Sequence, residues 1–302
     1  MKTLSDVIGK AASGVVLTSV LLLLGSDWSF AQESFTAKDR FFLRHEGVQI
    51  AIDPEAAFTL RQIKVNDAEL LVTVGFGGFT MAYPGMQWVG SGHTEGGREK
   101  VEEVSLEVDG KLVELPLGQT LDVNSVAVLR KTSRLREDVT LRTETRFENG
   151  VLQEIVNAEF HNPERIDHAY GFMYCWSPRT ESWMAETVDG ELIEGAFDSD
   201  GSWKLGKDVR WTSVFSKQMG VGAVVVFGED QPGQGHKHAF WDLERYHKQY
   251  FQLFQSAELP AGTSLKLVST LHFFTALNEE EWKQTVNTLS KLPTTSPKKR
   301  HE

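Results

Sequence analysis

The chain has 302 residues, of which 40% are hydrophobic, and its formal net charge is −11 at pH 7. This acidic balance argues against nucleic-acid binding, because phosphates require clustered lysine and arginine side chains, and the one dense basic run is Lys298–Arg300 near the C-terminus. The single cysteine, Cys175, excludes an intramolecular disulfide, so a hydrophobic core must stabilise the fold.

A short apolar run near the N-terminus is typical of a secretory signal peptide. A basic start precedes the run Ala11–Gly25, and Ser29 and Ala31 supply small residues at positions −3 and −1 of a cleavage site. The run is short for a membrane span, and an uncleaved N-terminal anchor is the alternative. We therefore expect residues 1–31 to be removed and the mature chain to be exported to the periplasm or the medium, with no membrane attachment after cleavage.

A glycine-rich segment, His93–Glu99, joins histidine, glutamate and arginine in a short stretch that predicts a loop at the end of a sheet. His93 and Glu95 are candidate catalytic residues, because an imidazole beside a carboxylate can act as an acid–base pair. Arg98 is a candidate for binding a substrate carboxylate. Two alternatives are a divalent cation bound by His93, Glu95 and Glu99, which we do not favour, and ion pairs of Arg98 that only stabilise the loop.

Turn dipeptides between alternating apolar and polar residues predict β-hairpins. They are Asp109-Gly110, Asn149-Gly150 and Asp189-Gly190. Both positions of such dipeptides readily take the positive φ that tight hairpin turns need. Further strands are predicted over Val209–Phe215, Val221–Phe227, Tyr246–Gln255 and Ser264–Phe274.

An aromatic strand is predicted between these hairpins. Four of its residues stand at even spacings and would share one face of a regular strand: His168, Tyr170, Tyr174 and Trp176. This face is either a binding floor or an aromatic part of the core. As a binding floor, the aromatic rings contact a sugar and His168 is a candidate catalytic residue.

Two further residues belong to this region. Arg179 follows the strand and is a candidate donor to a carboxylated sugar. Cys175 lies in an apolar run, which indicates a buried small hydrophobic residue rather than a nucleophile.

The segment Gly235–Phe254 is rich in aromatic, basic and histidine side chains. A sugar ring is apolar on its faces and polar at its edges, so this mixture suits a saccharide. The candidate binding residues are His236, His238, Trp241, Arg245 and Tyr250. His236 and His238 also have the spacing of a metal pair, but no third ligand follows from the spacing, and we predict no cofactor. A plain surface strand with Arg245 stacked on Trp241 is the alternative.

One segment has the pattern of an α-helix. Asn278 precedes a run of glutamates in which Glu281 completes a capping box, and four apolar residues then fall on one face: Trp282, Val286, Leu289 and Leu292. Strands joined by short turns, without βαβ alternation, predict an all-β protein, a large antiparallel β-sandwich with this C-terminal helix. We expect a single domain over residues 32–292, with a split near residues 120–135 as the alternative, and a disordered tail over residues 293–302.

Three segments resemble the galactose mutarotase-like superfamily, whose large β-sandwich is called a supersandwich. Gly97-Arg98 followed by Val104–Pro116 is similar to the family's sugar-site Gly-Arg and the hairpin after it. Asn157–Trp176 is similar to the segment with a site histidine and its aromatic neighbour, which match His168 and Tyr170. Tyr250–Phe273 is similar to the closing strands around a Leu-Pro turn. The resemblance implies the supersandwich fold, a saccharide ligand and epimerase-type acid–base chemistry.

The sequence departs from this family at the catalytic base. The family's epimerases have a glutamate on the penultimate strand, where this chain has Gln252 and Gln255, and an amide cannot accept a proton at neutral pH. The family's His-Gly-Gly segment is also absent. Three hypotheses follow: an exported enzyme that epimerises a sugar or acts as a lyase on a uronate, a non-catalytic carbohydrate-binding protein, and a structural periplasmic domain without a site. The oligomeric state is not predicted.

Overall fold

The computed structural model describes residues 35–75, 77–228 and 237–292. The predicted signal peptide over residues 1–31, the predicted tail over residues 293–302 and the candidate binding residue His236 lie outside these ranges. The predicted domain boundaries therefore stay predictions. Within the described ranges, no helix is long and apolar enough to cross a membrane.

The strands of the described residues form two sheets. The 12-stranded sheet contains, in spatial order, β10 (Thr120–Asp122), β1 (Phe41–His45), β2 (Val48–Asp53), β3 (Thr59–Val65), β4 (Ala68–Leu71), β14 (Glu164–Trp176), β21 (Tyr246–Leu259), β20 (Lys237–Leu243) and β17 (Trp203–Lys207), with β5 (Thr80–Ala82), β6 (Trp88–Gly90) and β7 (Gly97–Arg98) attached beside β14. The 10-stranded sheet contains β16 (Leu192–Ala196), β15 (Ser182–Thr187), β18 (Val209–Ser216), β19 (Val221–Phe227), β22 (Ser264–Thr275), β13 (Val151–Phe160), β12 (Val139–Glu148), β11 (Val126–Leu135), β8 (Lys100–Val108) and β9 (Lys111–Val113). The helices within the described ranges are η1 (Ala37–Asp39), η2 (Pro54–Ala56) and α1 (Glu279–Leu289).

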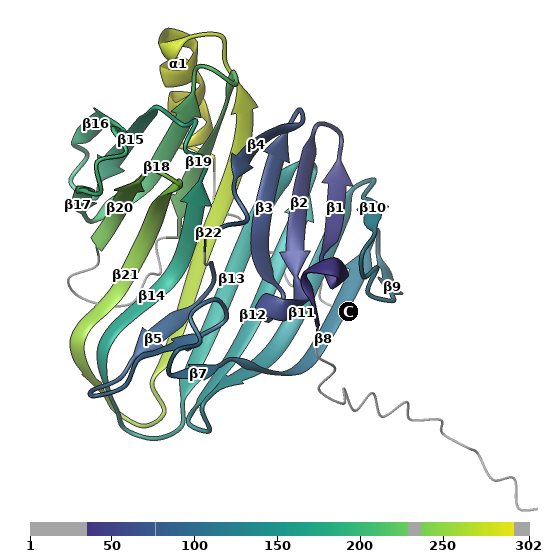
Figure 1. Ribbon diagram of the computed structural model, residues 1–302, viewed down its shortest axis with the longest axis vertical. Helices are drawn as coiled ribbons and strands as arrows, with labels where there is room; N and C mark the ends of the chain where they lie inside the picture. Colours follow the sequence, from purple (N-terminus) through teal and green to yellow (C-terminus); the bar gives the residue numbers. More distant parts are fainter. Residues whose placement is uncertain (1–34, 76, 229–236, 293–302) are drawn as a thin grey trace, which may run out of the picture. The chain divides into compact units, whose positions relative to one another are not determined.

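The two sheets lie as layers, and Figure 1 shows β1–β4 in front of β11–β13. Neighbouring strands are antiparallel except for β1 with β10 and β6 with β7, which are parallel. The predicted all-β sandwich with one C-terminal helix is therefore confirmed. β11 runs unbroken between β8 and β12 in the region where the alternative placed a split.

The predicted hairpins are all present. They are β8–β9, β12–β13 and β15–β16. Asn149 and Gly150 have φ values of 49° and 75°, and Asp109 and Gly110 have 49° and 79°. These positive values are the reason that the turns select Asn, Asp and Gly. The other predicted strands are β18, β19, β21 and β22, each with a start at the expected residue.

The hydrophobic core lies between the two sheets. Its fully buried side chains include Phe41, Phe147, Phe160, Trp176 and Phe251. Burial of a large apolar side chain stabilises a fold by about 1.5–3 kcal/mol, so this layer of aromatic residues supplies the stability that disulfides would supply elsewhere. Cys175 is buried beside Val72 and Tyr246, as expected for a small hydrophobic residue.

A bulge in β14 reverses the face on which its side chains lie. Tyr170 pairs with Gln252 and Met173 with Tyr250, so β14 holds one extra residue between these two pairs. Gly171 stands at this point. A Cβ atom there would lie 2.7 Å from Leu267 Cδ1 in the core, which explains the glycine.

The bulge corrects the prediction that four side chains share one face of this strand. His168 and Tyr170, before the bulge, face away from the 10-stranded sheet. Tyr174 and Trp176, after it, enter the core between the sheets. The prediction was wrong because it assumed a strict alternation, which one inserted residue shifts by one.

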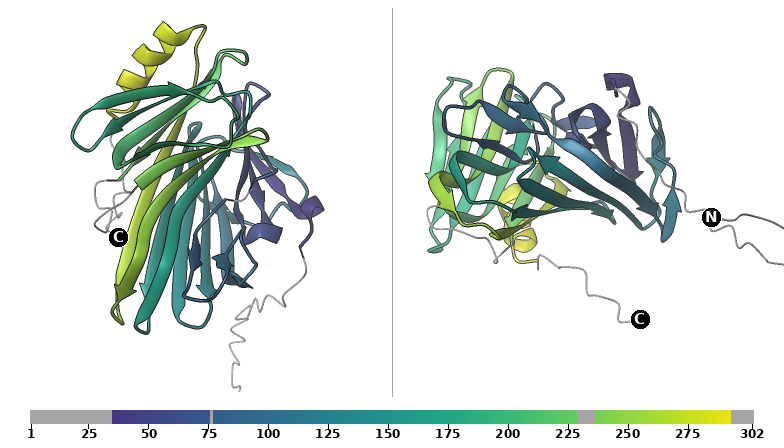
Figure 2. Two further views of the ribbon diagram at one scale, coloured as in Figure 1. Left: turned by 60° about the vertical axis from the view of Figure 1, so that its left-hand side comes forward. Right: turned by 90° about the horizontal axis from the view of Figure 1, so that it is seen from below.

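Helix α1 lies beside β19 and β22 at one end of the 10-stranded sheet (Figure 2). The Asn278 side chain caps it by accepting a hydrogen bond from Glu281 N at 3.0 Å. Glu281 reaches back to Leu277 N, one residue before the cap, rather than to the cap itself. Trp282 and Val286 are buried as predicted, whereas Leu292 is exposed because the helix ends at Leu289.

Candidate functional site

The candidate site lies on the outer face of the 12-stranded sheet, which is the face turned away from the 10-stranded sheet. Strand register places four residues in a row across this face. Trp88 on β6 pairs with Ala82 on β5, which pairs with His168 on β14. His168 in turn pairs with Gln255 on β21. Segments far apart in the sequence therefore meet beside His168.

A groove of about 580 Å³ opens at this row. It is lined by Ala82, Met86, Gln87, Trp88, Glu95, Asp167, His168 and Ser256. Trp88 offers a flat apolar surface, and the polar lining residues offer two carboxylates, an amide and an imidazole. A flat apolar wall beside hydrogen-bonding groups is complementary to a sugar ring.

Trp88 contacts the rings of three predicted site residues. Its indole stacks on the Tyr170 ring, with centroids 5.2 Å apart and planes at 24°. The rings of His93 and His168 lie 5.9 and 6.0 Å from it. The structure thus brings the predicted loop and the predicted aromatic strand together, although neither prediction included Trp88.

Lys248 contacts His93 and fixes which ring nitrogen carries the proton. Its Nζ lies 3.1 Å from His93 Nε2 and 4.9 Å from the centroid of the Tyr250 ring. An ammonium group only donates hydrogen bonds, so Nε2 accepts and the ring proton is on Nδ1, 3.5 Å from Glu95 Oε1. Burial, and then the charge of Lys248, lower the pKa of His93. His93 is therefore a neutral imidazole at pH 7.

Five rings continue across the outer face, and we call them the aromatic row: Trp88, Tyr170, Tyr250, Trp203 and Trp241. The Tyr170 and Tyr250 centroids are 4.8 Å apart, and Trp203 lies 5.4 Å from Tyr250. Trp203 and Trp241 stack at 5.7 Å with planes at 7°. The predicted binding residues Tyr250 and Trp241 therefore share a face with Tyr170.

Tyr174 and Trp176 do not reach the groove, because the bulge in β14 turns them into the core. Tyr174 OH donates to Glu154 Oε2 at 2.7 Å, and Trp176 Nε1 donates to Gln249 Oε1 at 2.9 Å. Burial raises the pKa of Glu154 to about 7, although the hydrogen bond from Tyr174 opposes this rise. The Tyr174–Glu154 bond joins the two sheets, whereas the Trp176–Gln249 bond lies within the 12-stranded sheet.

His238 is also in the core rather than on the outer face. It is 1% exposed, and its ring lies 4.1 Å from the Phe227 ring and 4.4 Å from the Phe251 ring. Trp241, three residues later on β20, faces outward, so the alternation of the strand places His238 on the opposite side. Its predicted role as a surface ligand is wrong for this reason.

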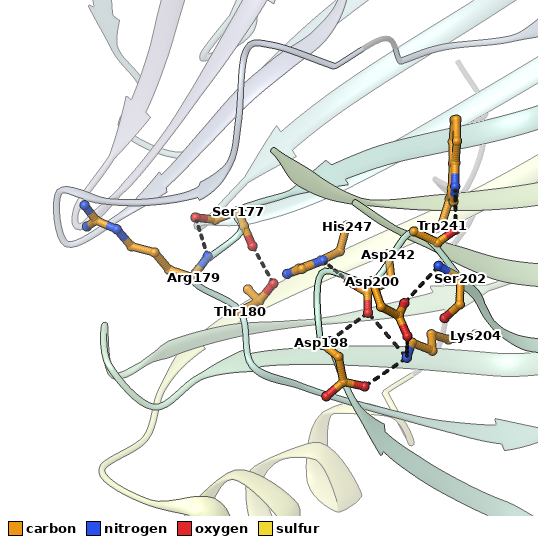
Figure 3. Close-up of polar contacts among 11 residues, drawn as sticks. Ser177, Arg179, Thr180, Asp198, Asp200, Ser202, Lys204, Trp241, Asp242 and His247 are labelled. Atoms are coloured by element: carbon orange, nitrogen blue, oxygen red, sulfur yellow. Dashed lines mark hydrogen bonds and ion pairs between the residues drawn. The ribbon is translucent and has the colours of Figure 1, made fainter. Parts of the chain in front are cut away.

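The three predicted arginines are exposed, and none of them lines the groove. Arg98 is on β7, and Arg245 is in the turn between β20 and β21. Figure 3 shows that the Arg179 side chain extends away from His247 and Trp241. The alternative interpretation of a plain surface strand has Arg245 stacked on Trp241. In the structure, Trp203 stacks on Trp241 instead.

The metal alternatives are not assembled in the described residues. Glu99 forms a buried ion pair with Lys131 and accepts a hydrogen bond from Ser133, so it does not join His93 and Glu95. His238, the described member of the other pair, is in the core. Throughout residues 35–75, 77–228 and 237–292, no group of three or more His, Cys, Asp or Glu side chains is arranged to hold a metal ion.

A buried polar cluster lies on the inner side of β20 and β21 (Figure 3). Asp242 is fully buried, with Oδ1 2.7 Å from His247 Nδ1, and its Oδ2 accepts a hydrogen bond from Asp198 N at 2.7 Å. Lys204 Nζ lies 3.0 Å from Asp198 Oδ2 and 3.5 Å from Asp242 Oδ2. These contacts attach the segment before β17, and β17 itself, to β20.

His247 is packed from both sides within this cluster. Its ring stacks on Phe197 at 4.0 Å with planes at 2°. Burial lowers the pKa of His247, and the neighbouring Asp242 only partly opposes this change. His247 is therefore a structural residue of the hairpin and not part of the outer face.

Sequence reasoning missed Trp88, Trp203 and Lys248 on the outer face, and it also missed the groove residues Ala82, Met86, Gln87, Asp167 and Ser256. Lys248 could have been found, because it is two residues from Tyr250 on one strand and must share its face. Trp88 and Trp203 lie on short strands of three and five residues. Such strands carry too little pattern to show which face an isolated tryptophan occupies.

No protein-family model matches this chain, and no curated protein matches it. Solved structures are similar to it in fold. A putative aldose 1-epimerase from Escherichia coli K12 has 9% identity and a TM-score of 0.46, over 78% of this chain and 99% of that one. A galactose mutarotase-like protein from Clostridium acetobutylicum has 8% identity and a TM-score of 0.43, over 76% of this chain and 93% of that one.

The galactosidase domain of an α-galactosidase–sucrose kinase has 8% identity and a TM-score of 0.51. The match covers 79% of this chain but only 41% of that one. At such identities the similarity concerns the fold alone. The large β-sandwich expected from the resemblance to galactose mutarotase-like proteins is therefore confirmed, and the activities named for these proteins remain theirs.

Proposed function

We propose that this protein binds a saccharide in the groove beside Trp88. The observation that carries this proposal is the combination of the Trp88 indole with Glu95, Asp167 and His168 in one lining. One face of a sugar ring can stack on the indole while its hydroxyl groups bond to the carboxylates and the imidazole. The fold shared with a galactosidase domain supports a carbohydrate ligand.

The charges of the groove favour a neutral sugar over a uronate. The described lining holds two carboxylates, Glu95 and Asp167, and contains no lysine or arginine. A carboxylated sugar would meet charges of its own sign there, which opposes binding. Arg98 and Arg179, which the sequence offered as carboxylate ligands, lie outside this lining.

The test is isothermal titration calorimetry of the purified protein against neutral, amino and uronic sugars, after a thermal-shift screen has identified binders. Trp88→Ala is expected to weaken binding of a neutral sugar by roughly 10-fold or more, because the stacking surface is removed. Leu112→Ala, which truncates an exposed side chain on β9 of the other sheet, is the matched control and should bind as the unmodified protein does. Failure of every sugar to bind, or equal binding by Trp88→Ala, would contradict the proposal.

Acid–base catalysis on the bound sugar is the second candidate function. His168 lines the groove together with two carboxylates, and such chemistry requires a proton donor and a proton acceptor at the same substrate. The amide of Gln255 opposite His168 favours binding alone. Glu95 as base and His168 as acid are the residues that we would assign to catalysis.

Interconversion of the anomers of a bound sugar, followed by NMR, separates these two functions. A catalyst accelerates the exchange, Glu95→Gln and His168→Asn abolish the acceleration, and both variants still bind the sugar. If the unmodified protein binds a sugar without accelerating its conversion, the protein acts as a binding protein only.

We also propose that the protein binds the saccharide outside the cytoplasm. The basic start, apolar run and small residues before Gln32 support export by a cleaved signal peptide. N-terminal sequencing of the protein from the periplasm or medium of a bacterial host is expected to begin at Gln32. A chain that keeps its N-terminus and stays with the membrane would contradict this part of the proposal.

A further inference from the structure

Trp203 and Trp241 form a second aromatic surface at the far end of the aromatic row from the groove. Their rings are stacked nearly parallel, and Trp203 is 56% exposed. Of the seven tryptophans in the described ranges, Trp203 is the one that is exposed. An indole face that is open to water on a sheet costs solvation free energy. Exposed aromatic surfaces of this kind mark binding sites more often than do the smaller hydrophobic side chains that are exposed by chance.

This surface is held in place rather than loosely attached. Trp241 Nε1 donates to Gly201 O at 3.1 Å, which fixes the indole next to the start of β17 (Figure 3). On the other side of the hairpin, the buried Asp242 and Lys204 attach the same segment to β20. A rigid aromatic surface loses little conformational entropy when a ligand stacks on it.

The second surface is continuous with the groove. From Trp203, Tyr250 lies 5.4 Å away, then Tyr170 4.8 Å further, then Trp88 5.2 Å further. The strand order from Trp203 to Trp88 is β17, β20, β21, β14, β5 and β6, which is five strand spacings. The centroid distances along the row limit the separation of the Trp203 and Trp88 rings to about 15 Å, which exceeds the width of one pyranose ring.

Lys248, the cation beside Tyr250, is 1% exposed, so the polar groups offered to a ligand in the middle of the row are amides. Gln252 and Gln255 stand on β21 opposite Tyr170 and His168, and the Gln252 Nε2 donates to Gln255 Oε1 at 3.4 Å. Amide groups both donate and accept, which suits sugar hydroxyls. At the groove end the described lining carries carboxylates and no basic residue. The row is therefore complementary to uncharged sugar units.

From these observations we infer that the ligand is a chain of neutral sugars that lies across the outer face, with one unit in the groove at Trp88 and a later unit stacked on Trp203. This inference rests on the proposed saccharide site at Trp88 and extends it to an oligosaccharide or polysaccharide. A monosaccharide would occupy the groove and leave the Trp203 surface open.

The test uses the full chain and three series of one to six sugar units: β-1,4-linked glucose, β-1,4-linked mannose and α-1,4-linked glucose. Calorimetry is expected to show affinity that rises with chain length in one series. Trp203→Ala is expected to weaken hexasaccharide binding by roughly 5- to 30-fold and to leave monosaccharide binding within about twofold. Trp203→Phe, which keeps a flat ring, should restore most of the lost affinity, and Trp88→Ala should weaken both ligands.

The outcomes separate the two proposals. Suppose that Trp88→Ala weakens binding, but affinity does not rise with chain length or Trp203→Ala changes the affinity for neither the monosaccharide nor the hexasaccharide. The proposed site in the groove is then supported, and the inference of a sugar chain is wrong. Preference for a charged hexasaccharide of galacturonate or glucosamine, added as two further probes, would also overturn the inference. If no saccharide binds in any series, the proposed function fails and the inference fails with it.

Discussion

Asp242 and His247 form a buried pair that joins the two strands of the hairpin β20–β21, with Oδ1 and Nδ1 2.7 Å apart. Asp242 also accepts a hydrogen bond from Asp198 N and lies 3.5 Å from Lys204. One carboxylate thus connects three segments directly beneath Trp241. The stability of the hairpin and the position of the Trp203 surface depend on the same buried group.

Asp242→Asn is expected to lower the free energy of unfolding by about 2 kcal/mol, because the buried network loses its negative charge and one of its two acceptor oxygens. Urea unfolding followed by tryptophan fluorescence measures the change. Asp200→Asn is the matched control, since Asp200 contacts the same Lys204 from an exposed position 3.3 Å away, and its unfolding midpoint should stay near that of the unmodified protein. Equal midpoints for both variants would contradict a structural role for Asp242.

Acidification is expected to destabilise the protein through buried histidines. Burial lowers the pKa of His272, and His93 and His247 are shifted in the same direction. The unfolded chain therefore takes up protons near pH 6.5 before the folded chain does, so stability is lost as pH falls through and below that value. Chemical unfolding should give a lower free energy at pH 5 than at pH 7. In His272→Leu this difference should shrink, and an unchanged difference would count against the buried imidazole as its source.

Glu154 has the opposite dependence on pH. Burial raises its pKa to about 7 from an ordinary value near 4.5, so the folded state binds a proton that the unfolded state has released. The stabilising contribution is complete below pH 4.5 and is lost as pH rises through 7. Glu154→Gln, which keeps an oxygen for Tyr174, should gain stability relative to the unmodified protein between pH 5 and pH 8. In Tyr174→Phe, the Glu154 carboxyl observed by NMR should titrate at a higher pH, because a hydrogen bond that lowers its pKa is gone.

The bulge in β14 requires a glycine at its centre. A methyl group at Gly171 would lie 2.7 Å from Leu267 Cδ1 and 3.2 Å from Phe251 Cδ1, so Gly171→Ala is expected to cost about 1–3 kcal/mol of stability. Leu267→Val removes the atom that is met first. In a double-mutant cycle the alanine should therefore cost less in the valine background, and strict additivity would show that the contact does not limit the substitution.

Much of the fold was predictable because its signals are local. Asp109-Gly110 and Asn149-Gly150 need positive φ, which few other dipeptides tolerate, and the flanking alternation then fixes which residues face inward. Asn278 likewise marks the start of α1 from its own side chain alone. These features depend on residues that are neighbours in the chain.

The site was only partly predictable because it depends on strand order. His93, Glu95, His168, Tyr170 and Tyr250 were expected near a ligand, and the structure places them on one face. Their meeting point, Trp88, follows from the pairing of β6 and β5 with β14, which no local pattern encodes.

The wrong faces assigned to Tyr174, Trp176 and His238 have a single physical origin. Tyr174 and Trp176 were assigned to the outer face because a strand without a bulge keeps its alternation. His238 was assigned there from its spacing to His236, although its odd spacing to Trp241 placed the two on opposite sides of β20. A shift of the alternation by one residue moves a side chain from the core to the surface. The amino-acid composition of a strand does not reveal such a shift.

The extra residue in β14 also places the residues of one strand in two environments, the core and the outer face. Tyr174 and Trp176, after Gly171, pack between the sheets, whereas His168 lines the groove and Tyr170 packs against Trp88 and Tyr250 on the outer face. A substitution at His168 is therefore expected to change the groove at little cost to the packing between the sheets. An insertion or deletion between Tyr170 and Tyr174 would instead turn the core residues toward water.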